Sequence, residues 1–126
     1  MKKVIETEYA PAPIGPYSQA ILINQTLYTS GQIAINVKNG ELVTSNIIDE
    51  TEQVMQNLKE VLHAAKMNFE DVVKSTIYIT DMDDFVEINK VYGSYFNEKS
   101  APARETVQVA KLPKNVHVEI SLIAIK

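Results

Sequence analysis

The segment SAPARETVQV, residues 100–109, presents a single arginine directly after Ala-Pro-Ala. Because Pro102 restricts its own backbone and that of Ala101, the side chain of Arg104 extends from a pre-organised segment. Its planar guanidinium suits a carboxylate that is held by two parallel hydrogen bonds. Arg104 is therefore a candidate anchor for a small carboxylate ligand. An ion pair, within the chain or across a subunit interface, is the alternative.

A glutamate inside the last apolar run is the second candidate for chemistry. Glu119 lies in NVHVEISLIAIK, residues 115–126. A carboxylate that is buried there must accept hydrogen bonds or pair with a cation, or its pKa rises. Each condition suits a group that positions or deprotonates a water molecule, and a buried structural ion pair would explain the residue equally well.

Weaker signals come from three further places in the chain. Asn89 lies on the apolar stripe of a predicted helix, either as a pocket wall or as an amide that secures a loop. Ser30 and Gly31 put a hydroxyl beside a glycine, which marks the close approach of a ligand or a β-bulge. Tyr17 ends the stiff segment APAPIGPY with a polar-tipped ring, a pattern that is also common at interfaces.

The composition argues against several other chemistries. The chain has no cysteine and 2 histidines, His63 and His117, so we expect no thiol nucleophile, no disulfide and no structural metal site. No histidine is placed to activate Ser30, and no glycine-rich phosphate loop is present. The 12 Lys and Arg residues are scattered and the net charge is −4, which disfavours a nucleic-acid partner.

No segment of the sequence suggests a membrane or a secretory route. The two N-terminal lysines are followed by Glu6 and Glu8 rather than by an apolar stretch, and no apolar run approaches membrane-spanning length. We therefore expect a cytoplasmic protein that does not bind membranes.

The elements that must position these residues follow from the periodicity of a chain that is 45% apolar and 126 residues long, which suits one domain. A hairpin is predicted at Asn24-Gln25 and a second turn at Asn39-Gly40. Spacings of three and four predict helices over residues 46–66, with Ser45 or Asn46 as cap and Asp49 and Glu50 in the first turn, and over 81–96. Strands are predicted over 71–80, in the arginine segment and over 115–126, which gives an α+β fold with both helices on one sheet face.

The last strand has two different faces. One face is apolar throughout, with Val116, Val118, Ile120, Leu122 and Ala124. The other is half apolar, with His117, Glu119, Ser121, Ile123 and Ile125. Because two helices on one side leave the second face uncovered, we expect a partner subunit to cover it, in a homo-oligomer.

The arginine segment alternates in the same way. Arg104, Thr106 and Gln108 share one face, and Val107 and Val109 share the other. This alternation predicts that the guanidinium points away from the apolar side of the strand.

Five segments together closely resemble the RidA/YjgF family of small enamine and imine deaminases. They are IGPYSQA (14–20), SGQI (30–33), DVVKSTIYITDMDDF (71–85), PAR (102–104) and VEI (118–120). The resemblance runs nearly end to end, in order and spacing. It implies a single domain over residues 1–126 with a chorismate-mutase-like α+β fold, a mixed sheet with two helices on one face. It also implies a homotrimer with a central barrel and ligand clefts between subunits.

The same resemblance implies a 2-iminobutanoate/2-iminopropanoate deaminase without a cofactor. Such an enzyme hydrolyses reactive enamines and imines, such as 2-aminoacrylate from pyridoxal-phosphate-dependent dehydratases, to 2-keto acids and ammonia. Arg104 would bind the substrate carboxylate and Glu119 would act on water. The substrate-binding residues carried over with Arg104 are Tyr17, Ser30, Gly31, Asn89 and Thr106. Thr106 stands where many members have cysteine, so a thiol role is absent here.

Other functions remain open alternatives at this stage. Similar proteins act as non-enzymatic 2-keto-acid-binding regulators or as chaperone-like holdases. A holdase needs exposed apolar area rather than a guanidinium, so Arg104 favours an enzyme or a regulator. An endoribonuclease activity has also been attached to relatives, and the acidic composition argues against it.

Overall fold

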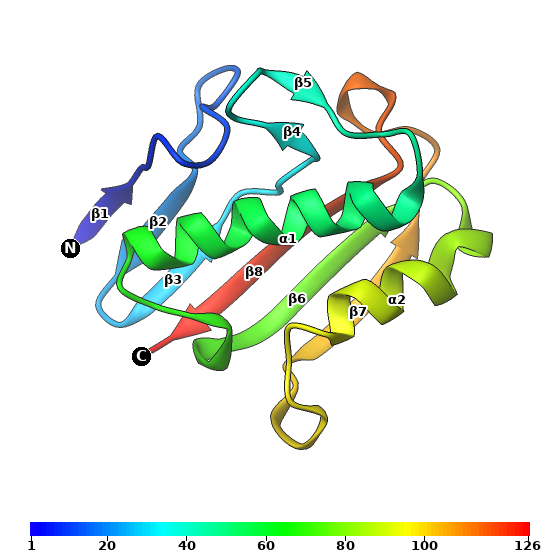
Figure 1. Ribbon diagram of the computed structural model, residues 1–126. Helices are drawn as coiled ribbons and strands as arrows, with labels where there is room; N and C mark the ends of the chain where they lie inside the picture. The colour runs from blue at the N-terminus through cyan, green and yellow to red at the C-terminus, as the bar shows by residue number, and fades with distance from the viewer.

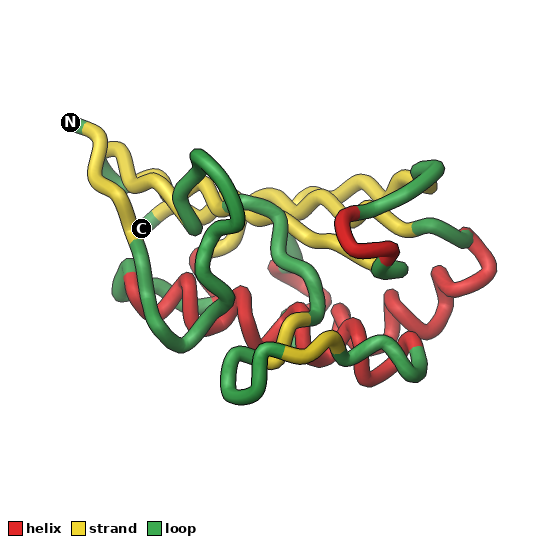
Figure 2. Tube along the Cα trace, turned by 90° about the horizontal axis from the view of Figure 1, so that it is seen from above, coloured by secondary structure: helices red, strands yellow, loops and turns green.

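A six-stranded mixed sheet forms one layer of the molecule and two helices form the other (Figures 1 and 2). The computed structural model describes residues 1–126. The strands of the large sheet are β1 (Lys2–Ile5), β2 (Ala20–Ile23), β3 (Thr26–Thr29), β6 (Val72–Ile79), β7 (Ala103–Gln108) and β8 (Val118–Ile125). A separate ribbon contains β4 (Ile35–Asn36) and β5 (Glu41–Leu42), and the helices are α1 (Ile47–Ala64) and α2 (Phe85–Gly93).

The strand order is β1-β2-β3-β8-β6-β7, so β8 lies inside the sheet and β7 lies at its edge. All neighbours are antiparallel except β6 and β7, which are parallel and are joined through α2. Both predicted turns are confirmed: Asn24, with φ of 53°, joins β2 to β3, and Gly40, with φ of 74°, lies in the β4–β5 turn. Figure 2 shows both helices on the same side of the sheet, as the sequence predicts.

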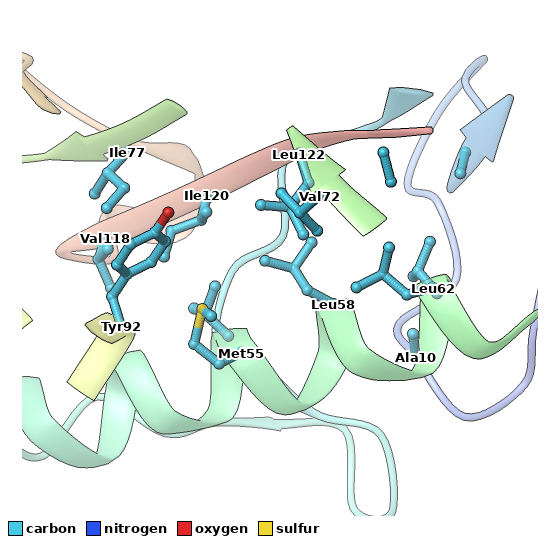
Figure 3. Close-up of a cluster of buried hydrophobic side chains, with 14 of the residues drawn as sticks. Ala10, Met55, Leu58, Leu62, Val72, Ile77, Tyr92, Val118, Ile120 and Leu122 are labelled. Atoms are coloured by element: carbon cyan, nitrogen blue, oxygen red, sulfur yellow. The ribbon is translucent and has the colours of Figure 1, made fainter. Parts of the chain in front are cut away.

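Helix α1 begins after Asn46, whose side-chain oxygen accepts a 2.8 Å hydrogen bond from the Asp49 N–H. An N-cap amide of this kind satisfies one of the free N–H groups of the first turn. The apolar face of α1 packs against β8, and Figure 3 shows Met55, Leu58 and Leu62 directed at that strand. The predicted helix over 46–66 is thus confirmed to within two residues at each end.

Helix α2 is shorter than the 81–96 predicted from spacing. Asp81 instead accepts a hydrogen bond from the Asp83 N–H and caps a separate 3₁₀ turn, Met82–Asp84. After Gly93 the chain continues with i→i+3 backbone hydrogen bonds as far as Phe96. Because these turns preserve the three-residue spacing, the apolar pattern extends beyond the α-helix itself.

The two faces of β8 differ as predicted. Its residues facing the helices are fully buried, namely Val118, Ile120, Leu122 and Ala124. The opposite, helix-free face leaves large apolar side chains exposed in the isolated chain, among them Tyr28, Tyr78, Val107 and Ile125. His117 departs from the prediction, because its ring contacts Glu50 at the start of α1. Neither helix has the length and apolar character that crossing a lipid bilayer requires.

Candidate functional site

Arg104 lies on the helix-covered face of the sheet. In the register of β6 and β7 it is paired with Ser75, which is fully buried and accepts a 2.7 Å hydrogen bond from the Tyr92 hydroxyl. The guanidinium carbon lies 5.1 Å from the ring centroid of Tyr92 and 5.7 Å from that of Phe85. Nη1 donates a 2.6 Å hydrogen bond to Oδ1 of Asn89. The prediction that this side chain points away from the face of Val107 is confirmed, and the face that it does point to is the one covered by the helices.

Strand β7 has apolar surroundings on both of its faces. Val107 lies on the helix-free face beside Tyr78, where exposed apolar side chains gather. Alternation along a strand states which residues share a face, and it does not state which face the helices cover. Burial against aromatic rings costs an arginine little, because its flat, weakly hydrated guanidinium stacks on them.

The surroundings of Arg104 form a pocket of about 390 Å³, here called the Arg104 pocket. It is lined by Asn89, Tyr92, Gly93, Phe96, Glu98, Ala101, Pro102 and Arg104. The ion pairs of the chain join Lys74 to Glu105 and Glu50 to His117, so Arg104 has no acidic partner within the chain. Asn89 takes one of the five guanidinium N–H donors, which leaves the group able to bind an anion.

Thr106 lies two residues beyond Arg104 on the same face of β7. Its hydroxyl oxygen is buried and has no hydrogen-bond partner. It is the one buried side-chain polar atom of the chain without a partner, which makes position 106 unusual as well as close to Arg104 in sequence.

Glu119 belongs to a different pocket, of about 570 Å³, here called the Glu119 pocket. Its walls come from the proline-rich loop, the segment after β3 and the 3₁₀ turn Pro113–Asn115. The lining residues are Pro11, Ala12, Ile14, Tyr17, Gln19, Ser30, Gly31, Gln32, Ile33, Ile35, Pro113, Lys114 and Glu119. The structure thus brings together four of the predicted site residues, Tyr17, Ser30, Gly31 and Glu119.

The carboxylate of Glu119 packs directly against the backbone of Gly31. A Cβ atom at position 31 would lie 2.2 Å from Oε2 and 2.9 Å from Cγ of Glu119, so a side chain there would displace the carboxylate. Burial raises the pKa of Glu119 above its ordinary value, and no ion pair opposes this rise. The structure thus excludes the alternative of a buried ion pair within the chain.

The loop that carries Tyr17 is held by a glutamine that the sequence analysis missed. Gln19 is 3% exposed, and its Nε2 donates to the carbonyl oxygens of Thr7, Ala10 and Pro11. The Tyr17 hydroxyl accepts a 3.2 Å hydrogen bond from the Ile14 N–H. Buried side-chain amides fix an irregular segment because they replace the backbone partners that it lacks.

Ser30 is fixed by the same region. Its Oγ donates a 2.6 Å hydrogen bond to the carbonyl oxygen of Ser18, and its N–H donates to that of Gln19. The hydroxyl oxygen can still accept a hydrogen bond from a ligand. No group of three or more histidine, aspartate or glutamate side chains is clustered so as to hold a metal ion.

The predicted site residues therefore divide into two sets within one chain. Arg104 and Asn89 line one pocket and Tyr17, Ser30, Gly31 and Glu119 line another, with no lining residue in common. The first pocket lies on the helix-covered face of edge strand β7, whereas Glu119 projects from the helix-free face of β8. Neither set alone combines an anion-binding group with a group able to move protons.

Known proteins match this chain over its whole length. The family model described as Endoribonuclease L-PSP matches residues 7–126. A RutC family protein of Pyrococcus horikoshii is 52% identical over 126 residues, which cover 100% of this chain and 99% of that protein. The 2-iminobutanoate/2-iminopropanoate deaminase of Mus musculus is 45% identical over 126 residues, covering 100% of this chain and 93% of that protein.

A solved structure extends the likeness to three dimensions. The crystal structure of E. coli TdcF with bound serine has a TM-score of 0.92 and 41% identity, with 98% of each chain covered. The family match spans both pockets, and four of the five segments that resemble the family contribute lining residues to them. The chain therefore belongs to the RidA/YjgF family.

Proposed function

We propose that the protein hydrolyses 2-imino acids to 2-keto acids and ammonia in a cleft between two copies of the chain in a homotrimer. The Arg104 pocket of one copy and the Glu119 pocket of another would face the same substrate. The observation that carries this proposal is the separation of an unpaired guanidinium and an unpaired carboxylate on opposite faces of one sheet. Because β7 is an edge strand, its pocket lies where a second chain can approach.

In this proposal Arg104 holds the substrate carboxylate. Its free N–H donors suit bidentate binding, and Asn89 together with the Tyr92 and Phe85 rings fixes the orientation of the guanidinium. An orientation fixed before binding reduces the entropy that substrate binding must overcome. The structure of TdcF with serine gives indirect support, because serine carries the same α-carboxylate.

Glu119 acts on water in the second half of the site. Its raised pKa makes the ionised carboxylate a stronger base than an ordinary glutamate. It takes a proton from the water whose oxygen attacks the imine carbon, and a C–O bond forms as the C=N double bond becomes single. The proton then passes to nitrogen, which gives a carbinolamine. The hydroxyl proton of this intermediate is transferred to nitrogen, the C=O bond forms as the C–N bond breaks, and ammonia and the 2-keto acid leave. The imine carbon is already electrophilic, so these residues supply position and proton transfer.

Relatives named as deaminases support an enzyme, whereas relatives named only as RutC family proteins leave the activity open. The alternative is a regulator that binds 2-keto acids at Arg104 without turnover. A regulator has no use for a carboxylate whose pKa is raised inside a pocket, so Glu119 favours catalysis. A net charge of −4 without a basic stripe disfavours RNA as the substrate.

The test is to generate 2-aminoacrylate in situ with a serine dehydratase and record pyruvate formation with and without this protein. We expect the protein to accelerate pyruvate release and Arg104→Ala to lose the acceleration. No acceleration by the wild-type protein, together with binding of pyruvate or 2-ketobutyrate that Arg104→Ala abolishes, would establish the regulator instead.

A further inference from the structure

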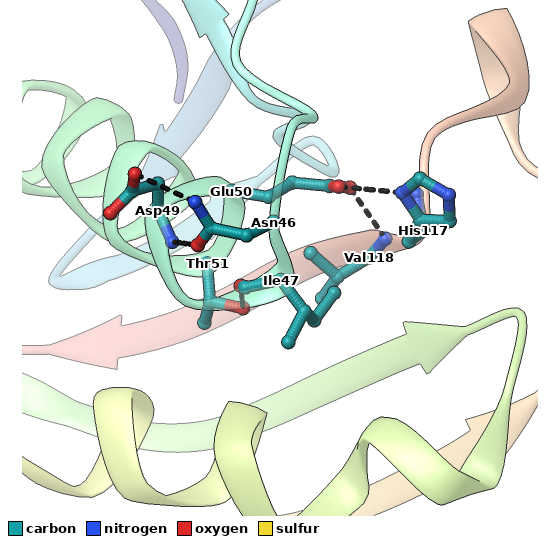
Figure 4. A network of polar contacts seen from close by, with 7 residues as sticks. All are labelled: Asn46, Ile47, Asp49, Glu50, Thr51, His117 and Val118. Atoms are coloured by element: carbon teal, nitrogen blue, oxygen red, sulfur yellow. Dashed lines mark hydrogen bonds and ion pairs between the residues drawn. The ribbon is translucent and has the colours of Figure 1, made fainter.

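Glu50 is a fully buried carboxylate that the proposed reaction does not use. It lies in the first turn of α1, where the sequence suggests only a favourable interaction with the helix N-terminus, and it is 0% exposed. Its Oε2 accepts hydrogen bonds from the N–H groups of His117, at 2.7 Å, and Val118, at 3.1 Å. Its Oε1 lies 2.7 Å from Nδ1 of His117 (Figure 4). Glu50 thus joins α1 to the first residues of β8.

These bonds replace a missing strand beside β8. In a strand, the N–H groups of alternate residues point to the same neighbour. The β3 side of β8 shows this series: the Leu122 N–H donates to Thr29 Oγ1, the Ile120 N–H to the Gln32 carbonyl, and the Val118 N–H to Glu50. Strand β3 ends before this point, so a side chain from a helix completes the series.

Glu119 lies between two of these fixed positions. One side of β8 pairs with β6 throughout this stretch. On the other side, the Val118 N–H donates to Glu50, and Ile120 exchanges two backbone hydrogen bonds with Gln32, so Glu119 is flanked by two fixed positions there as well. Its carboxylate packs against Gly31 so closely that even a methyl group there would displace it. A small shift of the strand start therefore moves the carboxylate relative to the pocket.

We propose that Glu50 is a positioning residue for Glu119, because its buried carboxylate fixes the start of β8 and with it the place of the Glu119 side chain in the pocket. This inference rests on the proposed function of Glu119. It assigns Glu50 no contact with substrate.

A positioning role differs from a merely structural one in what it changes. Loss of Glu50 leaves the N–H groups of His117 and Val118 without their partner, so that strand β6 alone holds this point of the strand. Water can then enter at that end of the strand, so the pKa of Glu119 falls toward its ordinary value. The titratable groups that line the same pocket are Tyr17 and Lys114, and neither contacts Glu50. A merely structural role would lower stability and leave this pKa and kcat unchanged in the folded protein.

The experiment compares Glu50→Ala and Glu50→Gln with the wild-type protein in two measurements. The first is the pKa of the Glu119 carboxyl by NMR in side-chain-labelled protein, assigned with Glu119→Gln. The second is kcat and KM for 2-aminoacrylate hydrolysis. For Glu50→Ala we expect a lowered Glu119 pKa and a kcat reduced by about 10- to 100-fold, with KM changed less than about 3-fold. The amide of Glu50→Gln still accepts from the backbone, so it should restore most of both properties.

Leu62→Ala is the matched control, because Leu62 is a fully buried residue of the same helix at the end remote from Glu119. It should lower the melting temperature without moving the Glu119 pKa or kcat. If Glu50→Ala does not fold, Glu50→Asp, one methylene too short to keep both backbone bonds, serves in its place. An unchanged Glu119 pKa in the folded Glu50 variants overturns the inference. A wild-type protein with no turnover overturns the proposed function instead, and the NMR titration still decides the role of Glu50.

Discussion

The Arg104 and Glu119 pockets hold their charged groups in opposite ways. The guanidinium lies between aromatic rings and donates to one amide, so its orientation is fixed while most of its donors stay free. The carboxylate of Glu119 packs against bare backbone at Gly31 without an ion-pair partner, and burial raises its pKa. The first arrangement favours binding an anion, because the guanidinium donors already have a fixed orientation. The second favours proton transfer, because burial disfavours the ionised carboxylate and so makes it a stronger base.

The largest effect that this comparison predicts is the loss of proton transfer in Glu119→Gln. The amide keeps the size of the carboxyl group and cannot take a proton from water, so kcat should fall by about 100- to 10,000-fold. KM should change little, because Arg104 binds the carboxylate in this proposal. Steady-state kinetics with dehydratase-generated imine measure both constants.

Glu105→Gln is the matched control for Glu119→Gln. Glu105 also lies on the helix-free face, where it is exposed and paired with Lys74 at 3.1 Å, outside both pockets. Its amide variant should keep kcat within about 2-fold of wild type. Full activity in Glu119→Gln would contradict the assignment of proton transfer to the Glu119 pocket and of substrate binding to the Arg104 pocket.

Arg104→Ala should have the next largest effect, on kcat/KM. Loss of one partner of a buried charge pair costs about 2 to 5 kcal/mol, which corresponds to about 30-fold to several thousand-fold. Arg104→Lys should recover only part of this loss, because an ammonium lacks the planar fork. Circular dichroism should show both variants folded, and a kcat/KM within a few fold of wild type in Arg104→Ala would contradict the assigned role.

Mixing the two inactive variants tests whether the pockets belong to one site. If Arg104 and Glu119 act from different copies in a closed trimer, refolding equal amounts of Arg104→Ala and Glu119→Gln together gives about a quarter of the sites both groups. About a quarter of the wild-type activity should then return. If both groups act from the same copy, every site lacks one of them and no activity returns.

Gly31→Ala should reduce activity while leaving the fold intact. The new methyl would meet the far end of the Glu119 side chain, which can move aside, so the carboxylate leaves its place. We expect kcat to fall by about 10- to 100-fold.

Gly40→Ala is the control, and we expect it to lower stability rather than activity. A Cβ at position 40 meets nothing within 4 Å, but the φ of 74° is strained for alanine. Gly40→Ala should cost about 1 kcal/mol in unfolding free energy and keep kcat.

The fold was predictable where one pattern decides one outcome. Three- and four-residue spacing located α1, and the all-apolar face of β8 located the side that the helices cover. The alternation of β7 correctly separated Arg104 from Val107, but the side of β7 that the helices cover was not predictable, because both sides meet apolar surroundings. The position of the guanidinium is then decided by the groups that it contacts, here Asn89 and two aromatic rings, which belong to a different element of the chain.

The candidate site was predictable only as residue types, not as an assembly. Gly31 was interpreted as a place where a ligand or another backbone comes close, or as a β-bulge, and the group that lies against it is the side chain of Glu119 from strand β8. Gln19 was not identified as a positioning residue, and Glu50 was interpreted only as an acidic residue of the first helical turn, because a buried glutamine or glutamate has no local pattern that separates it from an exposed one. Their importance comes from backbone groups that only the fold brings near.

A smaller effect is expected for Thr106→Val, which tests whether the Thr106 hydroxyl contributes to substrate binding. The buried Thr106 hydroxyl has no partner, so a valine of the same shape removes an unfavourable burial and should raise the unfolding free energy by about 1 kcal/mol. If position 106 contacts substrate only through its backbone, KM stays within about 3-fold of wild type. A KM raised about 10-fold or more would mean that this hydroxyl belongs to the binding half.

The smallest predicted effect is a pH dependence of stability with opposite signs at two glutamates of the helix-free face. The folded pKa of Glu119 is raised above its ordinary value of 4.5 by burial, so the folded chain binds this proton more tightly than the unfolded chain. The resulting penalty is absent below the ordinary pKa and develops as pH rises through the folded pKa. Glu119→Gln should therefore be more stable than wild type at neutral pH and equally stable in acid.

Glu105 should show the reverse. Hydrogen bonds from Lys74 and Thr76 lower its pKa, so its contribution to stability is present above the ordinary pKa and is lost as pH falls through the folded one. Glu105→Gln should thus be less stable than wild type at neutral pH, with the difference closing in acid. Urea unfolding at about pH 4 and about pH 7.5, at one chain concentration, measures both signs. If both variants were less stable than wild type at neutral pH, Glu119 would have a charge partner in the assembled protein. Burial would then not explain why Glu119 is a strong base in proton transfer.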